Sequence, residues 1–188
     1  MPKKKINRFR IKDISFMAIS LAMMYVFGKM LYILSRFFPI PGSRVLFTTP
    51  LFTFVLTAAV LKTKKIGTIS IIMGLLALIL LRLSIFGALA VGLAGLLTDL
   101  TTLVLIKSYT DYKSIYRTLA FHSFYSIWTS YLIISLFIEN SSFVLGNIFV
   151  VLLVSIILYI VAYYISKVSI RLFESRKLLD KKTHSFRD

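Results

Sequence analysis

Four ionisable side chains lie inside otherwise apolar stretches and are the first candidates for chemistry: Lys29, Arg82, Asp99 and His122. In a lipid bilayer such a group costs roughly 2.5–3.5 kcal/mol at the centre of a helix, so it usually has a structural or functional reason. Lys29 and Arg82 lie where a long side chain can reach the outer interface. For Lys29, ligand binding stands beside this interpretation as an alternative.

Lys29 shares one face of its predicted helix with small and aromatic residues. Helical spacing aligns it with Ala18, Ala22, Tyr25, Tyr32 and Arg36. The first half of this stripe carries small side chains, whereas the outer half carries aromatic and cationic side chains. Such an outer half suits an anionic or aromatic ligand that enters from outside. The alternative is an aromatic belt at the membrane interface, with Lys29 as its anchor.

Asp99 and His122 have simpler interpretations. Asp99 lies on a helical stripe of small residues with Ala88, Gly92, Gly95 and Thr102, which predicts close approach of a neighbouring helix. We therefore favour Asp99 as a hydrogen-bond acceptor between helices over a counter-ion to a buried cation. His122 is predicted to form an interhelical hydrogen bond, because it has no second histidine nearby and the chain has no cysteine. No metal ion or cofactor is expected.

Known catalytic patterns are missing from the sequence. It contains no Walker A sequence, no HExxH and no GxSxG. A membrane enzyme acting on lipid would need an acid/base pair or a metal cluster, and neither is present. We therefore expect no catalytic residues, and ATP-driven work would need an ATPase on another chain.

The composition defines the elements that must position these side chains. The 188 residues are 58% hydrophobic and carry a net charge of +16. So apolar a chain excludes a nucleic-acid-binding domain, a disordered chain and a water-soluble domain of this size. Its apolar runs lie at about 14–34, 44–61, 66–83, 86–107, 114–138 and 144–173. The predicted fold is an all-α integral membrane protein, a compact bundle of six transmembrane helices.

The basic residues predict the orientation of this bundle. With a cytoplasmic N-terminus, 19 of the 23 Lys and Arg residues lie in inner segments and three in outer segments. The positive-inside rule then places both termini in the cytoplasm, at the cell membrane. We expect a basic cytoplasmic tail at 1–13, the membrane domain at 14–174 and a second basic tail at 175–188. The tails would meet anionic lipid headgroups.

This layout resembles the substrate-binding S component of an energy-coupling factor (ECF) vitamin transporter. Size, six spans and orientation match, and Ala18-Ile-Ser-Leu-Ala22 resembles the AxxxA motif of the family's first helix. The proline-containing segment 38–44 is similar to the family's substrate-covering loop. The resemblance implies that Ala18 and Ala22 dock on a transmembrane coupling protein, which works with two cytoplasmic ATPases. It also implies capture of a vitamin or cofactor precursor from outside.

Within this family, ligand contact is expected in the outer half of the bundle. The expected contacts are Lys29, Tyr32, Arg36 and Arg44, with Tyr125 and Trp128 as stacking walls. Cations outnumber acids there, so an anionic or aromatic ligand is preferred. The alternative function is a six-span scaffold of the MreD type, which the segment 92–100 resembles. The AxxxA motif and the long proline-containing outer loop favour the transporter.

Overall fold

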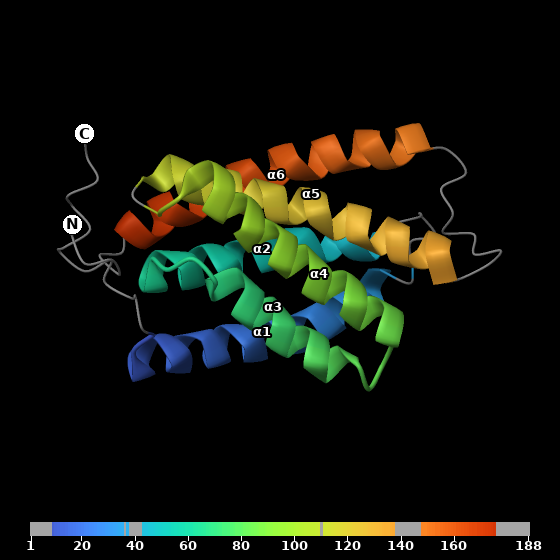
Figure 1. Ribbon diagram of the computed structural model, residues 1–188, viewed down its shortest axis with the longest axis horizontal. Helices are drawn as coiled ribbons and strands as arrows, with labels where there is room; N and C mark the ends of the chain where they lie inside the picture. The colour runs from blue at the N-terminus through green and yellow to red at the C-terminus, as the bar shows by residue number, and fades with distance from the viewer. Residues whose placement is uncertain (1–8, 36, 38–42, 110, 138–147, 176–188) are drawn as a thin grey trace.

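The structure is a computed structural model that describes residues 9–35, 37, 43–109, 111–137 and 148–175 (Figure 1). All regular secondary structure in these ranges is helical. The elements are α1 (Ile11–Ser35), α2 (Ser43–Thr63), α3 (Thr68–Leu80), α4 (Ile85–Thr101), the π-helical turn η1 (Thr102–Ile106), α5 (Tyr112–Phe137) and α6 (Ile148–Ser175). The tails outside Ile11 and Ser175 and the segment 38–42 lie largely beyond the described residues.

Five of these helical segments are long and apolar enough to cross a membrane. They are Ile11–Ser35, Arg44–Thr63, Ile85–Ile106, Tyr112–Phe137 and Ile148–Ser175. The third apolar run, predicted at 66–83, forms a shorter helix of 13 residues, α3. The chain is therefore an all-α, multi-pass membrane protein in its described part.

The helices form one bundle in which α2 occupies the middle. It contacts α1 on one side and α5 and α6 on another, and it also touches α3 (Figure 1). The hairpin of α3 and α4 joins the two sides, because α3 contacts α1 while α4 contacts α5. The start of α1, the end of α2 and the end of α6 lie at the same end of the bundle. We call this end, with the residues 64–67, 107–109 and 111, the tail end, and the opposite end the far end.

Local sequence explains how the α3–α4 hairpin begins and turns. Gly67 precedes α3 with φ of 96°, a left-handed conformation that costs glycine little. At the far end, the Ser84 hydroxyl accepts a hydrogen bond from the Gly87 backbone N–H at 3.2 Å and so caps α4. Gly67 therefore marks the start of α3, and Ser84 divides two apolar runs that nearly join in sequence.

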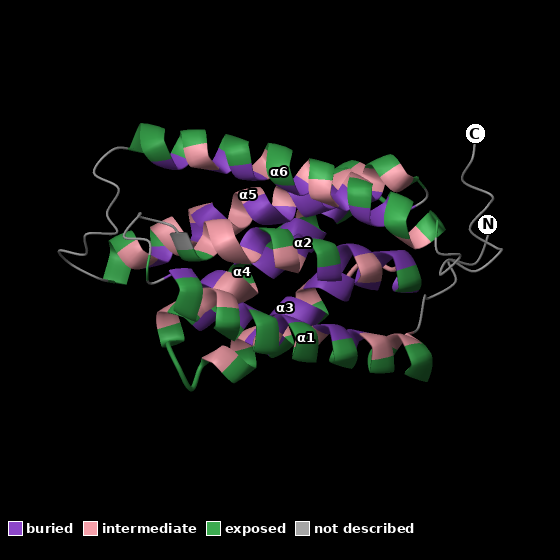
Figure 2. Ribbon diagram, turned by 180° about the vertical axis from the view of Figure 1, so that it is seen from behind, coloured by how far each residue is buried: buried purple, intermediate pink, exposed green. Residues whose placement is uncertain are grey.

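Burial follows the contacts of the bundle. Figure 2 shows buried residues concentrated toward α2 and the helix seams, with exposed residues on the outward faces of α1, α4 and α6. The outward residues of α6 are large and apolar, as Leu153, Ile157 and Ile160 illustrate. An outer surface of this kind suits lipid as its surroundings.

Candidate functional site

The predicted stripe on α1 lies mainly on the outside of the bundle. Ala18, Ala22 and Lys29 are exposed. The buried face of the same helix carries Met17, Ser20, Met24, Gly28 and Ser35. A Cβ atom at Gly28 would lie 3.2 Å from the Phe52 ring, so this buried face packs tightly on α2. The two alanines therefore take no part in the buried packing of α1, and Lys29 lies on the surface.

Two of the predicted ligand residues meet at the far end. The Arg44 guanidinium lies 4.6 Å from the centroid of the Tyr32 ring, a cation–π contact between α2 and α1. Arg44 is exposed and Tyr32 is half-buried. Arg36 and residues 38–42 of the proline-containing loop lie outside the described residues. The structure thus brings together one cation and one aromatic ring of the expected set.

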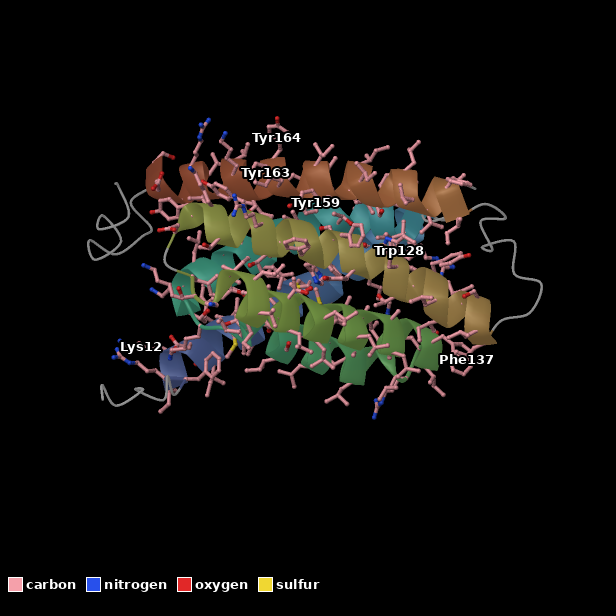
Figure 3. The ribbon with its side chains drawn as sticks, turned by 45° about the horizontal axis from the view of Figure 1, so that its top comes forward. Lys12, Trp128, Phe137, Tyr159, Tyr163 and Tyr164 are labelled. Carbon is pink, nitrogen blue, oxygen red and sulfur yellow. The ribbon has the colours of Figure 1, made fainter. Side chains whose placement is uncertain are left out.

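The other two predicted residues belong to an aromatic strip on α5. Tyr125 and Thr101 share a hydrogen bond of 2.8 Å between their hydroxyls, which ties α5 to α4. Trp128 lies against Phe124 and Tyr131, with ring centroids 6.1 and 6.2 Å away. Its indole N–H is buried and has no hydrogen-bond partner among the described residues. Figure 3 shows Trp128 on α5 and Tyr159 on the neighbouring α6.

The described members of the predicted ligand set come from two sides of the bundle, with Arg44 on α2 between them. Tyr32 lies on α1, which packs on α2 and α3, whereas Trp128 lies on α5, which packs on α2, α4 and α6. Lys29 is exposed on α1, and Tyr125 is engaged with α4. Arg44 contacts Tyr32, but the two residues that follow it, Val45 and Leu46, pack with Trp128 against the same buried cluster of Ile127, Val151 and Leu158.

Asp99 lies at a polar junction near the tail end. Its Oδ2 accepts a hydrogen bond of 2.6 Å from the Ser70 backbone N–H, in the first turn of α3. The Ser70 hydroxyl donates to the Gly95 carbonyl at 3.1 Å. Asp99 thus supplies a hydrogen-bond acceptor to the N-terminal end of α3, where backbone N–H groups have no partner within the helix. The prediction that it accepts a hydrogen bond between helices is confirmed.

The small-residue stripe of α4 faces α3, as its spacing predicts. A Cβ atom at Gly95 would lie only 2.5 Å from the Met73 Cβ, and one at Gly92 would lie 3.4 Å from the Ala77 Cβ. The distance at Gly95 requires glycine, whereas the distance at Gly92 is an ordinary van der Waals contact. The predicted close approach is confirmed, and its partner is α3 of the same chain.

Tyr109 is a member of this junction that sequence reasoning missed. It is buried in the segment between η1 and α5, beside Asp99, Thr102 and Thr118. Burial, followed by the nearby Asp99 carboxylate, raises the pKa of the Tyr109 hydroxyl, so it stays a neutral phenol. A short connecting segment gives no sequence signal that one of its residues turns inward.

His122 lies on the face of α5 that meets α4. Its Nδ1 is 3.2 Å from the Thr98 hydroxyl, and the ring is buried. Because Thr98 also donates to the Ala94 carbonyl at 2.6 Å, the histidine N–H is the donor to Thr98. The predicted interhelical hydrogen bond is confirmed. In the described part of the chain, no group of three or more His, Cys, Asp or Glu side chains is placed to hold a metal.

An ion pair at the tail end was also missed. Lys65, in the short segment between α2 and α3, lies 2.8 Å from Asp13 at the start of α1. Asp13 also accepts a hydrogen bond from the Arg10 backbone N–H at 3.0 Å. Sequence separation hides this pair, because the two residues meet only once α1 and the α2–α3 hairpin lie side by side.

Comparison of the chain with protein-family models, curated proteins and solved structures found no match. The expected family therefore depends on the residues and the layout described above.

Proposed function

We propose that the chain is the substrate-capture subunit of an ECF-type importer in the cell membrane. The observation that carries this proposal is the exposed pair Ala18 and Ala22 on α1. Small residues let two helices approach closely in lipid, yet the bundle itself does not bury these two. They remain available to a separate transmembrane coupling protein, which would work with two cytoplasmic ATPases.

The proposed topology has six crossings, with α3 as the short one. With six crossings both ends of the chain lie on the same side of the membrane, and the proposed side is the cytoplasm. The cations support this orientation, because most described lysines and arginines lie at the tail end: Arg10, Lys12, Lys62, Lys64, Lys65, Lys107, Lys113, Arg117, Lys167 and Arg171. Arg44 and Arg82 are at the far end, which becomes the external face.

The proposed substrate is a vitamin or cofactor precursor with an anionic or aromatic group. Arg44 and Tyr32 support this part, because an exposed guanidinium held over an aromatic ring can bind a carboxylate or phosphate and a flat ring. Arg36 is four residues beyond Tyr32 and is proposed as a second cation. Trp128 and Tyr125 become walls of a separate aromatic surface, and Lys29 becomes an interfacial anchor.

The alternative of an MreD-type scaffold has less support. That resemblance rests on the segment 92–100, in which Gly95 and Asp99 would serve partner contact. Both residues are instead engaged with α3 inside the chain, through Met73 and Ser70. The segment therefore has an internal role that accounts for its pattern.

Assembly with the coupling protein tests the proposal directly. We expect the chain to copurify with a transmembrane protein and two ATPases, and Ala18→Trp or Ala22→Trp to abolish this association. Val168→Trp is the matched control, since Val168 is an exposed residue on the tail-end half of α6. Intact assembly in both alanine variants would contradict the docking role of α1.

Substrate capture needs a second measurement. Mass spectrometry of small molecules retained by the purified chain should identify a vitamin or precursor, and Arg44→Ala should lose it. Arg82→Ala is the control, because Arg82 is an exposed cation at the same end. Equal retention by both variants would remove Arg44 from the ligand site.

A further inference from the structure

Aromatic rings line the seam between α5 and α6. Phe121 on α5 contacts Tyr159 on α6, and Tyr116 contacts Tyr163, each with ring centroids 5.6 Å apart. Figure 3 shows Tyr159 between the two helices, whereas Tyr164 points away from the bundle. The two ring contacts fix how α5 and α6, which run in opposite directions, are aligned along the seam.

Cations continue both sides of this seam toward the tail end. On α5, Lys113 and Arg117 precede Phe121 at steps of four residues, so the three side chains lie on one face of the helix. On α6, Lys167 and Arg171 extend the face of the two tyrosines by the same step. We call Lys113, Arg117, Lys167 and Arg171 the seam cations.

The alignment of the helices brings the seam cations to similar levels. One turn toward the tail end from the ring contact of Phe121, Arg117 is level with Tyr163. A second turn brings Lys113 level with Lys167. Positive side chains from two helices therefore face the same stretch of the seam, where they repel one another unless an anion lies among them.

Nearby acids do not neutralise the seam cations. In the part of the chain that the structure describes, none of the four forms an ion pair. Glu174 and Arg171 both act electrostatically on Tyr116, so one acid lies near the seam, and Asp111 immediately precedes α5. Two acids beside four cations leave an excess of positive charge. This excess favours a ligand with negative charge.

The same seam also presents apolar surface to the membrane. Phe121 and Tyr159 are half-buried, so part of each ring stays accessible. Ile156 and Ile160, which flank Tyr159 on α6, are large and exposed. The seam thus offers positive charge at the tail end and apolar surface deeper in the bundle, which matches a molecule with an anionic head and a hydrocarbon chain.

We propose that the α5–α6 seam binds an anionic phospholipid, with its phosphate among the seam cations and an acyl chain along Phe121 and Tyr159. Lysine and arginine form strong charge-assisted hydrogen bonds to phosphate oxygens. Basic sites between transmembrane helices bind anionic headgroups in this way. A soluble anion would use the cations alone and gain nothing from the rings. The site lies on α5 and α6, away from Ala18 and Ala22 on α1, and is independent of the proposed importer function.

Native mass spectrometry of the purified, delipidated full chain in a neutral detergent tests this proposal. The chain is titrated separately with dioleoylphosphatidylglycerol, dioleoylphosphatidylcholine and glycerol 3-phosphate. The anionic lipid should fill one site per chain with a Kd at least tenfold lower than that of the zwitterionic lipid, and glycerol 3-phosphate should not bind in the same range. Equal Kd values for the two lipids would overturn the proposal. Binding of glycerol 3-phosphate as tight as that of the anionic lipid would overturn the lipid as occupant.

Two double variants with the same change in charge locate the site. Arg117→Gln with Lys167→Gln should weaken binding of the anionic lipid about twentyfold, because each cation near a membrane surface contributes a factor of roughly five. Arg10→Gln with Lys12→Gln is the matched control, since both residues are exposed at the tail end beside α1. It should change the Kd less than twofold. An unchanged Kd in the seam variant, or an equal loss in both variants, would overturn the site.

A third variant keeps the proposal testable if the first seam variant does not fold. Lys113→Gln with Arg171→Gln removes the other two seam cations, both of which are exposed, and should also weaken the anionic lipid about twentyfold. An unchanged Kd would overturn the site. Because no coupling protein, ATPase or vitamin is present in these measurements, their outcome does not depend on the importer function.

Discussion

Small residues line one stripe on α1 and another on α4, and the fold uses the two stripes differently. On α4, Gly92 and Gly95 are held against α3, and Asp99 completes the contact through Ser70. On α1, Ala18 and Ala22 are exposed, and the helix packs through Met17, Met24 and Gly28 instead. Of two stripes that both contain small residues, one is therefore packed against another helix of the chain and the other is exposed.

The difference shows what the spacing of small residues does not determine by itself. Small residues permit close helix approach, but they do not say whether the partner belongs to the same chain. On α4 a polar residue continues the stripe, and its need for a hydrogen-bond partner ties that face to the interior. The stripe on α1 continues instead through Tyr25 to Lys29, which is exposed and long enough to reach the membrane interface. A short acid that needs a nearby hydrogen-bond donor thus marks the internal stripe here.

The largest loss of stability is expected when a side chain is added to the internal stripe on α4. Gly95→Ala places a Cβ 2.5 Å from the Met73 Cβ, which forces α3 and α4 apart. We expect a loss of about 3 kcal/mol in unfolding free energy, the upper part of the range for overpacking. Gly74→Ala on α3 is the control, because a Cβ there meets nothing within 4 Å. Thermal unfolding in detergent measures both, and equal Tm values would refute the close contact.

Removing the polar end of the internal stripe should have the next largest effect. Asp99→Ala leaves the Ser70 backbone N–H, in the first turn of α3, without its acceptor. The expected loss is about 2 kcal/mol. Asp111→Ala changes an exposed acid and should stay near wild type. A larger loss in Asp111→Ala than in Asp99→Ala would contradict the capping role.

The buried and exposed faces of α1 can be compared by introducing valine on each face in turn. Gly28→Val adds bulk where a Cβ already lies 3.2 Å from the Phe52 ring. We expect a loss of about 1.5 kcal/mol, reported by chemical or thermal unfolding. A neutral result would mean that α1 can shift on α2 at little cost.

Ala22→Val should have the smallest effect in this series. Ala22 is exposed, so valine costs only about 0.5 kcal/mol through its lower helix propensity. The unfolding free energy of the isolated chain is the relevant measurement. A loss as large as that of Gly28→Val would show that the exposed stripe is engaged within the folded chain, and the contrast between the faces would fail.

The sequence predicts the helical architecture well, because apolar runs and turn residues act locally. Asp99 and His122 were also assigned correctly as interhelical hydrogen-bonding residues, since a polar side chain in an apolar helix must find a partner. Tyr109 and the pair Asp13–Lys65 escaped prediction. Their partners are set by how helices assemble, and periodicity within one helix carries no such information.

The candidate ligand residues were only partly predictable for the same reason. Helical spacing correctly placed Lys29 on the stripe of Ala18 and Ala22. Spacing alone did not tell which side of the bundle that stripe faces. The contact of Arg44 with Tyr32 and the separation of Tyr32 from Trp128 depend on α2 lying between α1 and α5.

The shortness of α3 has a consequence for the surrounding lipid. Its 13 residues rise about 20 Å, roughly 10 Å less than the hydrocarbon core of a typical bilayer. Its outward residues, such as Leu75 and Leu78, are exposed and apolar, so lipid must cover them. Hydrophobic mismatch of this kind thins the adjacent bilayer. The membrane beside α3 is therefore expected to be thinner than the membrane beside α6. The thickness of the surrounding bilayer would then differ from one side of the protein to the other.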